Sequence, residues 1–342
     1  MTRTASAPRG SADPLDTAYD VALLDLDGTV YLSGAAIPGA PEALRKAEAA
    51  GMRLAYVTNN AFRTPAAIAE LLTGFGVPAT PSDVVTSAQA AAHLLAERLP
   101  AGAPVLVVGG NGLRTALRER GLRPVTNAAV HPQAVVQGYS PGVDYSLLAE
   151  GGLAVAAGAL FVASNADLTL PSSRGNQPGN GSFIQVIATA TGVRPVVAGK
   201  PEPPLYHESV QRTGAKHPLV VGDRLDTDIE SATRVGADSL LVLTGVTGLT
   251  EAILAPPEQR ATYIAEDLTG LLEPHPAVTS DDGEFCCAGW TARLDGNQLQ
   301  LTGTGPRIDG LRALCAAAWS ADPGKVTEES ARPAIQRLTA AR

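Results

Sequence analysis

Short apolar runs that end abruptly in polar or glycine-rich turns alternate with helical patterns along most of this sequence. The first two runs are Val21–Leu24 and residues 53–57, and a helical pattern over residues 41–50 separates them. A strand, a helix and a second strand in this order are typical of a parallel sheet with a right-handed crossover. The alternation continues, so the sequence predicts an α/β fold with further strands at residues 105–108, 134–137, 159–163, 195–198, 218–221 and 239–243.

The chain changes character near both ends. The first 17 residues are rich in Ser, Ala and Pro and contain no apolar run, so we predict a disordered leader over residues 1–17. Alternation over residues 285–301, with the turn signal Asp295-Gly296, predicts a hairpin, and two helical patterns follow it. This C-terminal extension is too short for a large core of its own, so we expect it to pack on the rest of the protein or to support a homodimer.

Composition and charge restrict the function. With 342 residues the chain is long enough for two domains, and its formal net charge of −8 argues against a broad basic face that binds nucleic acid. No stretch reaches the roughly 18 consecutive apolar residues that a membrane span needs, so we expect no membrane partner. Three cysteines, two of them adjacent, suit neither a disulfide framework nor a zinc site, and we therefore expect a reducing, cytoplasmic location.

Reactive polar residues follow four of the predicted strands. Side chains just beyond the carboxyl ends of neighbouring parallel strands converge on one crevice, so four such strand ends predict a single site. The residues are Asp25 and Asp27 after the first strand, Thr58 and Asn59 after the second, Lys200 after residues 195–198, and Asp223 after residues 218–221.

The mixture of these groups indicates phosphoryl chemistry. Three carboxylates without a nearby cysteine or histidine suit a hard cation bound by oxygen, and Mg²⁺ is the usual one. A lone lysine supplies positive charge to an anion, and hydroxyl and amide groups can hold phosphoryl oxygens. A bound cation lets an anionic carboxylate approach a phosphate, which that carboxylate can attack to form an aspartyl-phosphate. The residues therefore predict a magnesium-dependent phosphatase with Asp25 as the nucleophile.

Four ordered segments resemble the four motifs of the haloacid dehalogenase (HAD) superfamily. The resemblance covers about residues 20–267, and its DxDGT and GDxxxTD patterns are specific. It implies a Rossmann-like parallel core and phosphatase activity. The matching segments are Asp25-Leu26-Asp27-Gly28-Thr29-Val30, the segment around Thr58, Gly199-Lys200-Pro201, and Gly222-Asp223-Arg224-Leu225-Asp226-Thr227-Asp228.

The resemblance also implies the catalytic and metal-binding roles of the acidic residues. Asp25 is then the nucleophile and a metal ligand. Asp27 is the general acid and base, and it binds the metal through its backbone carbonyl. Asp223 is the second carboxylate ligand of Mg²⁺, and Asp228 is a supporting residue that orders a metal-bound water or Lys200. An acidic residue at position 27 favours rapid hydrolysis of the phospho-enzyme over its persistence.

The resemblance assigns the substrate-binding roles in the same way. Thr58 and the backbone of Asn59 hold the phosphoryl group, while Lys200 balances its charge and that of Asp25. Three further residues are weaker candidates for contacts to the rest of the substrate: Asp167, Arg174 and Arg63.

The spacing of the motifs places an inserted domain. Thr58 follows Asp25 by 33 positions, which leaves no room for a cap, whereas 142 positions separate Thr58 from Lys200 and can hold a whole α/β cap. This layout resembles the branch of NagD and the 4-nitrophenylphosphatases, whose cap is of type C2. We therefore predict a HAD core over residues 18–82 and 195–272, a cap over residues 83–194, and a short C-terminal α+β extension over residues 273–342.

Within this branch, the element Pro178-Gly179-Asn180-Gly181-Ser182 and the additional tail are similar to actinobacterial glycerol 3-phosphate phosphatases, whose tail resembles part of an acetyltransferase. The resemblance implies a small phosphorylated metabolite as the substrate, with glycerol 3-phosphate first and phosphoglycolate or pyridoxal phosphate second. The tail lacks an acetyl-CoA loop, so we expect no acetyl transfer. A non-catalytic phosphoester sensor is the alternative from another class, but a sensor has no need of a proton donor such as Asp27.

Two other features have ordinary structural interpretations. The GGNG segment at residues 109–112 follows a strand but lacks the spacing of a dinucleotide-binding motif, so we predict a turn there. Asp226 lies where a helix cap is wanted, so we favour capping as its role.

Overall fold

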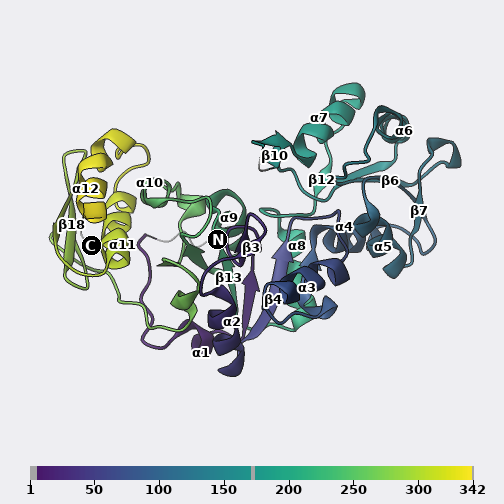
Figure 1. Cartoon of the computed structure of the whole chain (residues 1–342). Coiled ribbons are helices and arrows are strands. Elements are labelled where there is room, and N and C mark those ends of the chain that lie inside the picture. The colour runs from purple at the N-terminus through teal and green to yellow at the C-terminus, as the bar shows by residue number, and fades with distance from the viewer. Residues whose placement is uncertain (1–5, 171–173, 341–342) are drawn as a thin grey trace. The chain divides into compact units, whose positions relative to one another are not determined.

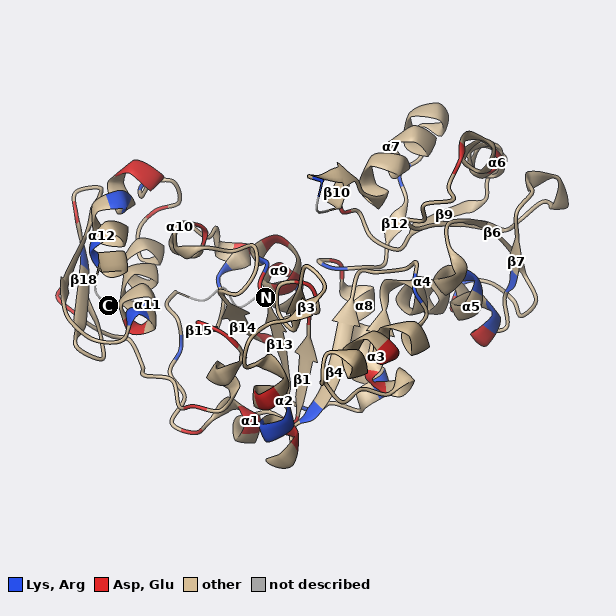
Figure 2. Ribbon diagram, viewed as in Figure 1, with Lys and Arg blue, Asp and Glu red and all other residues tan. Residues whose placement is uncertain are grey.

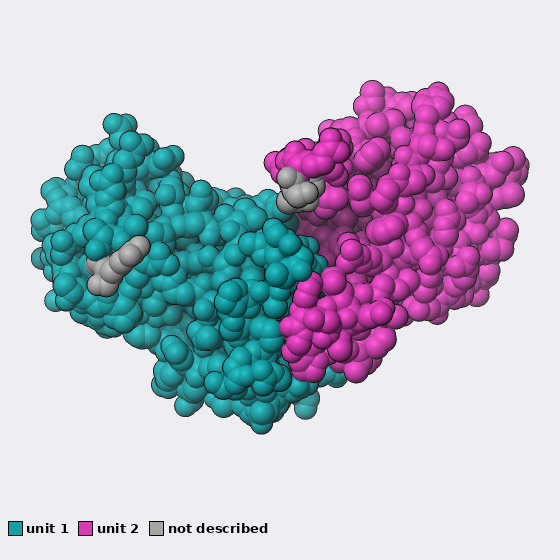
Figure 3. Space-filling view, viewed as in Figure 1, with its two compact units in different colours: residues 1–54, 215–342 teal, residues 55–214 magenta. Residues whose placement is uncertain are grey.

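The computed structural model describes residues 6–170 and 174–340. The chain divides into two compact units, one from residues 1–54 and 215–342 and the other from residues 55–214 (Figures 1 and 3). The division falls inside strand β4 (Arg53–Thr58). The core and cap limits given above stay predictions.

Parallel strands form the centre of the first unit, as the sequence predicted. Their order is β15-β14-β13-β1, and each pair is parallel. Leu24 lies opposite Val221, so β1 and β13 end almost level with each other. All four residues of β1 are buried, which is typical of a parallel strand that is covered on both faces. The strands are β1 (Val21–Leu24), β13 (Pro218–Gly222), β14 (Asp238–Val242) and β15 (Tyr263–Ala265).

Short helices connect these strands. Helix α2 buries Ala40, Ala43, Leu44 and Ala47, a spacing that forms one apolar stripe, and Gly51 follows it with a φ of +106°. Glycine is the residue that most often takes this left-handed conformation just after a helix ends. The helices are α1 (Leu15–Ala18), α2 (Ala40–Ala49), α9 (Glu230–Val235) and α10 (Leu249–Ile253), with a π-helical turn at Leu225–Ile229, 3₁₀ turns at Pro257–Gln259 and Leu268–Leu271, and a small hairpin of β2 (Tyr31–Leu32) and β3 (Ala35–Ala36).

The predicted disordered leader is wrong for its second half. Ser11 forms an antiparallel bridge with His275, in which each backbone N–H donates to the other residue's carbonyl over 2.9 Å. Leu15 is fully buried. The Ser-, Ala- and Pro-rich composition suggested disorder, but paired backbone groups and one core leucine hold the segment against the unit. Residues 1–5 lie outside the described residues.

The C-terminal extension belongs to the first unit. Its four strands form an antiparallel sheet in the order β16-β17-β18-β19, and two helices pack against it (Figure 1). Asp295 pairs with Gln298 across a two-residue turn in which Gly296 has a φ of +64°, so the predicted hairpin is confirmed. The elements are β16 (Thr279–Asp281), β17 (Glu284–Cys287), β18 (Trp290–Asp295), β19 (Gln298–Gly303), α11 (Arg307–Trp319) and α12 (Glu328–Ala340).

The extension packs on the parallel sheet, as expected. One apolar cluster includes Leu241 and Ile264 of the parallel strands together with Trp290 of the extension. Arg312 of α11 donates two hydrogen bonds, of 2.7 and 3.2 Å, to the carbonyl of Ile264, and its charge is balanced by Asp309 at 2.5 Å. The extension therefore covers the outer strand β15 and satisfies one of its backbone acceptors, which would otherwise lie exposed at the edge of the sheet.

The second unit contains two sets of parallel strands. In one, β4 pairs with β5, and helices α3, α4 and α8 accompany them. In the other, five strands run in the order β12-β9-β8-β6-β7. The elements are α3 (Pro65–Gly74), a 3₁₀ turn (Pro81–Asp83), β5 (Val84–Thr86), α4 (Ser87–Ala96), β6 (Pro104–Val108), α5 (Asn111–Glu119), β7 (Arg123–Val125), a 3₁₀ turn (Ala128–Val130), β8 (Ala134–Gln137), α6 (Tyr145–Ala156), β9 (Leu160–Ala163), β10 (Thr169–Leu170), β11 (Gln177–Pro178), α7 (Asn180–Thr191), β12 (Val196–Val197) and α8 (Pro203–Thr213).

The sheet predicted for the strand before Lys200 is wrong. We expected residues 195–198 to be a strand of the same sheet as β1 and β13. Instead, β12 is only two residues long and pairs with β9 in the five-stranded sheet. Lys200 is therefore not positioned as the residue after a strand of the β1–β13 sheet. An apolar run predicts a strand but carries no signal for which of two sheets it will join.

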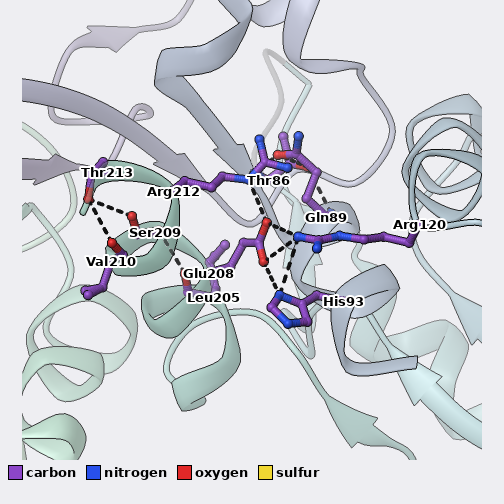
Figure 4. Close-up of polar contacts among 10 residues, drawn as sticks. All are labelled: Thr86, Gln89, His93, Arg120, Leu205, Glu208, Ser209, Val210, Arg212 and Thr213. Carbon is purple, nitrogen blue, oxygen red and sulfur yellow. Dashed lines mark hydrogen bonds and ion pairs between the residues drawn. The ribbon is translucent and has the colours of Figure 1, made fainter. Parts of the chain in front are cut away.

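Three helices of the second unit are joined by one buried carboxylate, as Figure 4 shows. Glu208 of α8 has a side chain that is only 1% exposed. It accepts hydrogen bonds from Arg120, at the end of α5, and from Arg212, at 2.7 and 2.6 Å. His93 of α4 contacts the same carboxylate through Nδ1. These four residues are called the Glu208 cluster below.

Charged residues of both signs are interspersed along each unit (Figure 2). Within the described ranges, no helix combines the length and the apolar composition needed to cross a bilayer.

Candidate active site

The first acidic residue of the candidate site is fixed by the strand that precedes it. β1 is apolar through Leu24, and the next backbone N–H, that of Asp25, donates to the carbonyl of Val221 over 2.8 Å. This bond continues the pairing of β1 with β13 by one residue. Asp25 is thus the first polar side chain after a buried strand, and it is itself partly buried.

Asp223 follows β13 and is fully buried. Its Oδ2 accepts a hydrogen bond of 2.7 Å from the backbone N–H of Val246, and its Oδ1 accepts a weak one of 3.4 Å from the hydroxyl of Thr29. Its backbone carbonyl accepts from the N–H of Thr247 at 3.2 Å. The loop at residues 244–247 was not predicted as part of the site. The only local signal for it was a run of Thr and Gly directly after a predicted strand.

Two glycines make room for the Asp223 carboxylate. A Cβ atom on Gly28 would lie 2.4 Å from Oδ2 of Asp223, and one on Gly245 would lie 2.0 Å from it. Gly28 also has a φ of +88°, which side chains rarely tolerate. The hydroxyl of Thr244 donates to the carbonyl of Gly28 over 2.6 Å and joins the two loops. The glycine of the DxDGT pattern is therefore required both by its backbone conformation and by the carboxylate beside it.

Asp228 lies in the π-helical turn and is almost fully buried. Its Oδ2 accepts from the backbone N–H of Arg224 at 3.2 Å, so this side chain holds the start of the turn. The capping role that we favoured for Asp226 is wrong. Asp226 is exposed and instead forms two hydrogen bonds, of 3.0 and 2.7 Å, with the guanidinium of Arg224. The N–H that needed a partner is taken by Asp228.

Asp25, Asp223 and Asp228 form a carboxylate cluster. Each offers one oxygen, and the three oxygens lie within 4.8 Å of one another. Carboxylate oxygens so close together are typical of ligands for Mg²⁺, which binds oxygen and tolerates little else. The buried cradle around Asp223 holds one of these ligands in a fixed position, so the residues present fit the predicted ion.

Asp27 lies outside this group of three. Its side chain is exposed, and its Oδ2 accepts a hydrogen bond of 3.2 Å from the hydroxyl of Tyr31. The backbone N–H of Gly28 donates to the carbonyl of Tyr31 over 2.8 Å, so Asp27 and Tyr31 lie close together across a tight turn. An exposed carboxyl can exchange protons with water, which suits the predicted general acid and base.

The second unit brings together the predicted substrate-binding residues. Thr58 ends β4 and is 8% exposed, and its Oγ1 accepts from the N–H of Asn60 at 3.1 Å. Lys200 is 6% exposed, and its Nζ donates to the carbonyl of Val57 over 3.2 Å. The side chain of Asn59 contacts the backbone of Lys200. These three predicted residues are therefore neighbours.

The weaker candidates divide. Asp167 is half-buried, and its Oδ2 accepts from Nδ2 of Asn59 at 3.2 Å, whereas Arg174 and Arg63 are exposed. Sequence reasoning missed Asn165, whose amide donates to the carbonyl of Asn59 over 2.9 Å. Only its position after a predicted strand could have indicated it.

The turn predicted for the GGNG segment is confirmed only for its first half, because Asn111 and Gly112 already belong to helix α5. The glycine within the helix has a packing role. The N–H of Gly112, in the first turn of α5, donates to the carbonyl of Phe62 over 3.1 Å. A Cβ atom on Gly112 would lie 2.5 Å from the carbonyl oxygen of Ala61. The start of α5 thus binds the chain that follows Asn59, which accounts for glycine there without a nucleotide.

Three family models match the chain. A haloacid dehalogenase-like hydrolase model matches residues 22–123, and a HAD-hydrolase-like model matches residues 197–271. The D-glycerol 3-phosphate phosphatase of Mycobacterium tuberculosis is 43% identical over 340 residues, which cover 93% of this chain and 94% of that protein. The chain belongs to the haloacid dehalogenase-like hydrolase family. A third model, a GCN5-related N-acetyltransferase like domain, matches residues 287–339, so the predicted resemblance of the tail is confirmed.

Other relatives place this HAD hydrolase among phosphatases. Acid sugar phosphatase of Staphylococcus aureus is 41% identical over 233 residues, or 68% of this chain and 89% of that protein. The solved glycerol phosphate phosphatase of Mycobacterium tuberculosis, in complex with magnesium, superposes with a TM-score of 0.87 at 43% identity over 96% of this chain and 99% of that one. A p-nitrophenyl phosphatase from Archaeoglobus fulgidus has a TM-score of 0.69 at 28% identity over 74% of this chain and 98% of its own. The predicted phosphatase branch is confirmed.

Proposed function

We propose that this HAD phosphatase hydrolyses glycerol 3-phosphate in a reaction that depends on Mg²⁺. The observation that carries the proposal is the match, over nearly the whole of both chains, to a D-glycerol 3-phosphate phosphatase. That match covers 93% of this chain, whereas the acid sugar phosphatase match covers 68% of it. Sugar phosphates are the competing substrates, since a relative of similar identity is named for them.

The carboxylate cluster is the proposed binding site for Mg²⁺. Asp25 and Asp223 would hold the ion through side-chain oxygens and Asp27 through its backbone carbonyl, and Asp228 would support them from the same cluster. The ion would neutralise part of the negative charge of the phosphate, so that an anionic nucleophile can approach it.

In the first proposed step, an oxygen of the Asp25 carboxylate attacks phosphorus in line with the ester oxygen. A bond forms between Asp25 and phosphorus while the bond from phosphorus to the ester oxygen breaks. Asp27 donates its proton to that oxygen, so glycerol leaves as a neutral alcohol. Thr58, the backbone of Asn59 and Lys200 are proposed to hold the phosphoryl oxygens and balance their charge.

In the second step, Asp27 removes a proton from water as the water oxygen attacks phosphorus. The bond between phosphorus and Asp25 breaks, and inorganic phosphate is released with the Asp25 carboxylate restored. The same exposed carboxyl therefore acts first as an acid and then as a base, which completes the proton balance of the cycle.

We also propose a cytoplasmic location. The three cysteines are all free thiols, two of them buried, which suits a reducing compartment. The predicted homodimer stays a prediction.

A panel of phosphorylated metabolites tests the proposal. Purified protein is incubated with glycerol 3-phosphate, phosphoglycolate, pyridoxal phosphate and a sugar phosphate, each with Mg²⁺ and with EDTA, and phosphate release is measured. We expect the highest kcat/KM for glycerol 3-phosphate and loss of activity in EDTA.

The Asp25→Asn variant is the control for the mechanism. It removes the nucleophile and keeps the size of the side chain, so phosphate release should fall by about 10⁴-fold or more. Turnover at the wild-type rate by this variant would reject the aspartyl-phosphate mechanism. A preference for another metabolite would reject only the substrate assignment.

A further inference from the structure

The side chain of Asn59 pairs with both backbone groups of Lys200. Its Oδ1 accepts from the Lys200 N–H at 2.8 Å, and its Nδ2 donates to the Lys200 carbonyl at 3.1 Å. One amide thus fixes the backbone of one residue at two points, as a neighbouring strand would. The segment lies tightly against it, since a Cβ atom on Gly199 would be 2.5 Å from Oδ1 of Asn59.

The backbone of Asn59 is itself held in place. Its carbonyl accepts from the hydroxyl of Ser87 at 2.7 Å and from Nδ2 of Asn165 at 2.9 Å. Ser87 is fully buried and Asn165 is 6% exposed, so these donors are fixed by the interior of the unit. The amide of Asn59 therefore extends from a rigid point, and it can transmit that position to Lys200.

The other end of Lys200 is held by the residue on the opposite side of Thr58. Nζ donates to the carbonyl of Val57, while the backbone is held by Asn59. The lysine is therefore fixed by the residues that directly precede and follow Thr58. Because lysine carries its charge on a flexible four-carbon stem, holding both its backbone and its ammonium restricts where that charge can lie.

We propose that Asn59 is a positioning residue, which sets the place of the Lys200 ammonium relative to the Thr58 hydroxyl through its side-chain amide. This goes beyond the role predicted from sequence, in which only the backbone of Asn59 acts. It rests on the proposed function, because it matters for catalysis only if Lys200 and Thr58 bind the phosphoryl group.

The same amide extends the arrangement to Asp167. Nδ2 donates to Oδ2 of Asp167 at 3.2 Å, and the N–H of Asp167 donates to Oδ1 of Asn165 at 3.2 Å. The orientation of the Asn59 amide follows from these contacts, because a flipped amide would point its NH₂ group at the Lys200 N–H and its oxygen at a carboxylate and a carbonyl. A carboxylate at position 59 would meet the same repulsion.

A double-mutant cycle tests the proposal. Asn59→Ala should lower kcat/KM for the best substrate by about 100-fold, mostly through kcat, because a displacement of a binding group by about 1 Å can cost that much. Lys200→Ala should also lower kcat/KM. In the Lys200→Ala background, the additional Asn59→Ala change should cost less than about 3-fold, because Asn59 then has no ammonium to position.

Two further variants make the result unambiguous. Asn59→Asp keeps the volume and one hydrogen bond but should be about as impaired as Asn59→Ala, so it supports the test if the alanine variant folds poorly. Asn127→Ala is the matched control, since Asn127 is an exposed asparagine of the same unit whose Oδ1 accepts from the nearby backbone N–H of Ala129. It should keep wild-type kinetics, and thermal unfolding should show all variants folded.

The possible outcomes separate this inference from the proposed function. Independent effects, in which Asn59→Ala costs 100-fold with or without Lys200, would overturn the positioning role. Wild-type activity of both Asn59→Ala and Asn59→Asp would overturn it as well. Wild-type activity of Lys200→Ala would instead remove the phosphoryl-binding role of the lysine, which is a failure of the proposed function on which the inference rests.

Discussion

Buried carboxylates occur in two contrasting settings in this protein. In the second unit, Glu208 is surrounded by two arginines and a histidine (Figure 4). In the first unit, three carboxylates lie together, with oxygens within 4.8 Å of one another. The negative charge of a single carboxylate among cationic side chains is already balanced. Three carboxylates that lie together repel one another, and a bound cation would reduce that repulsion.

The Glu208 cluster uses charge to hold the fold together, whereas the carboxylate cluster is expected to use charge for function. The Glu208 cluster joins α4, α5 and α8, so its ionic contacts link helices that are far apart in the sequence. The carboxylate cluster lies at strand and turn ends. It is next to glycine positions at which any side chain would collide with a carboxylate. We therefore expect loss of Glu208 to affect stability, and loss of Asp223 to affect metal binding.

The largest expected effect is on stability in the Glu208 cluster. Glu208→Gln removes the negative charge from a buried group and leaves Arg120 and Arg212 facing a neutral amide. The free energy of unfolding should fall by about 3–5 kcal/mol, as for other buried pairs that lose one partner. Urea unfolding followed by circular dichroism measures it.

Glu97→Gln is the matched control for this prediction. Glu97 also contacts His93, at 3.4 Å, but its side chain is 68% exposed. Its loss should cost less than about 0.5 kcal/mol, because exposed ion pairs are screened by water. Equal losses in the two variants would contradict the structural role assigned to the buried carboxylate.

The next largest effect is stabilisation by Mg²⁺. An ion bound only by the folded state should raise the free energy of unfolding by about 2.7 kcal/mol at 100 times its Kd. We expect this gain in the wild type and in Glu208→Gln, and its loss in Asp223→Asn. Urea unfolding with and without MgCl₂ measures it, and a full Mg²⁺ gain in Asp223→Asn would place the ion elsewhere.

Without metal, we expect a smaller effect, in which Asp223→Asn is more stable than the wild type. Asp223→Asn removes one of three clustered negative charges, so in EDTA its free energy of unfolding should exceed that of the wild type by about 1 kcal/mol. The amide oxygen can still accept from Val246, whose N–H now bonds to Oδ2. A clear loss of stability in EDTA would show that the cluster is already balanced by the protein itself.

The smallest effect concerns acid. Burial alone raises the pKa of Glu208, but hydrogen bonds from Arg212 and His93 and the charges of Arg212 and Arg120 outweigh it, so the pKa lies below its ordinary value of 4.5. The unfolded chain then takes up the proton first, so this contribution to stability is complete above pH 4.5 and is lost as pH falls further. Glu208→Gln should lack this part of the acid sensitivity, measured by urea unfolding at about pH 6 and about pH 4. An identical pH dependence in both proteins would contradict the lowered pKa.

Local patterns predicted much of the fold and most of the candidate site. The predictions of a strand at Val21–Leu24, of the helix that follows it and of the hairpin at Asp295-Gly296 are confirmed. These elements could be predicted because strand periodicity and turn chemistry depend on neighbouring residues. The motif that begins at Asp25 indicated the family, which the comparisons confirm. Composition misled at residues 9–17, because a single buried leucine and a short bridge hold a segment that otherwise looks disordered.

The sequence by itself thus determined the parallel α/β architecture and the identity of the reactive carboxylates, since both are written in short patterns. Only the tertiary structure decided that β12 joins the five-stranded sheet and that the amide of Asn59 holds Lys200. The physical reason is distance along the chain. Asn59 and Lys200 are 141 positions apart, and a hydrogen bond between such residues leaves no local trace in the sequence.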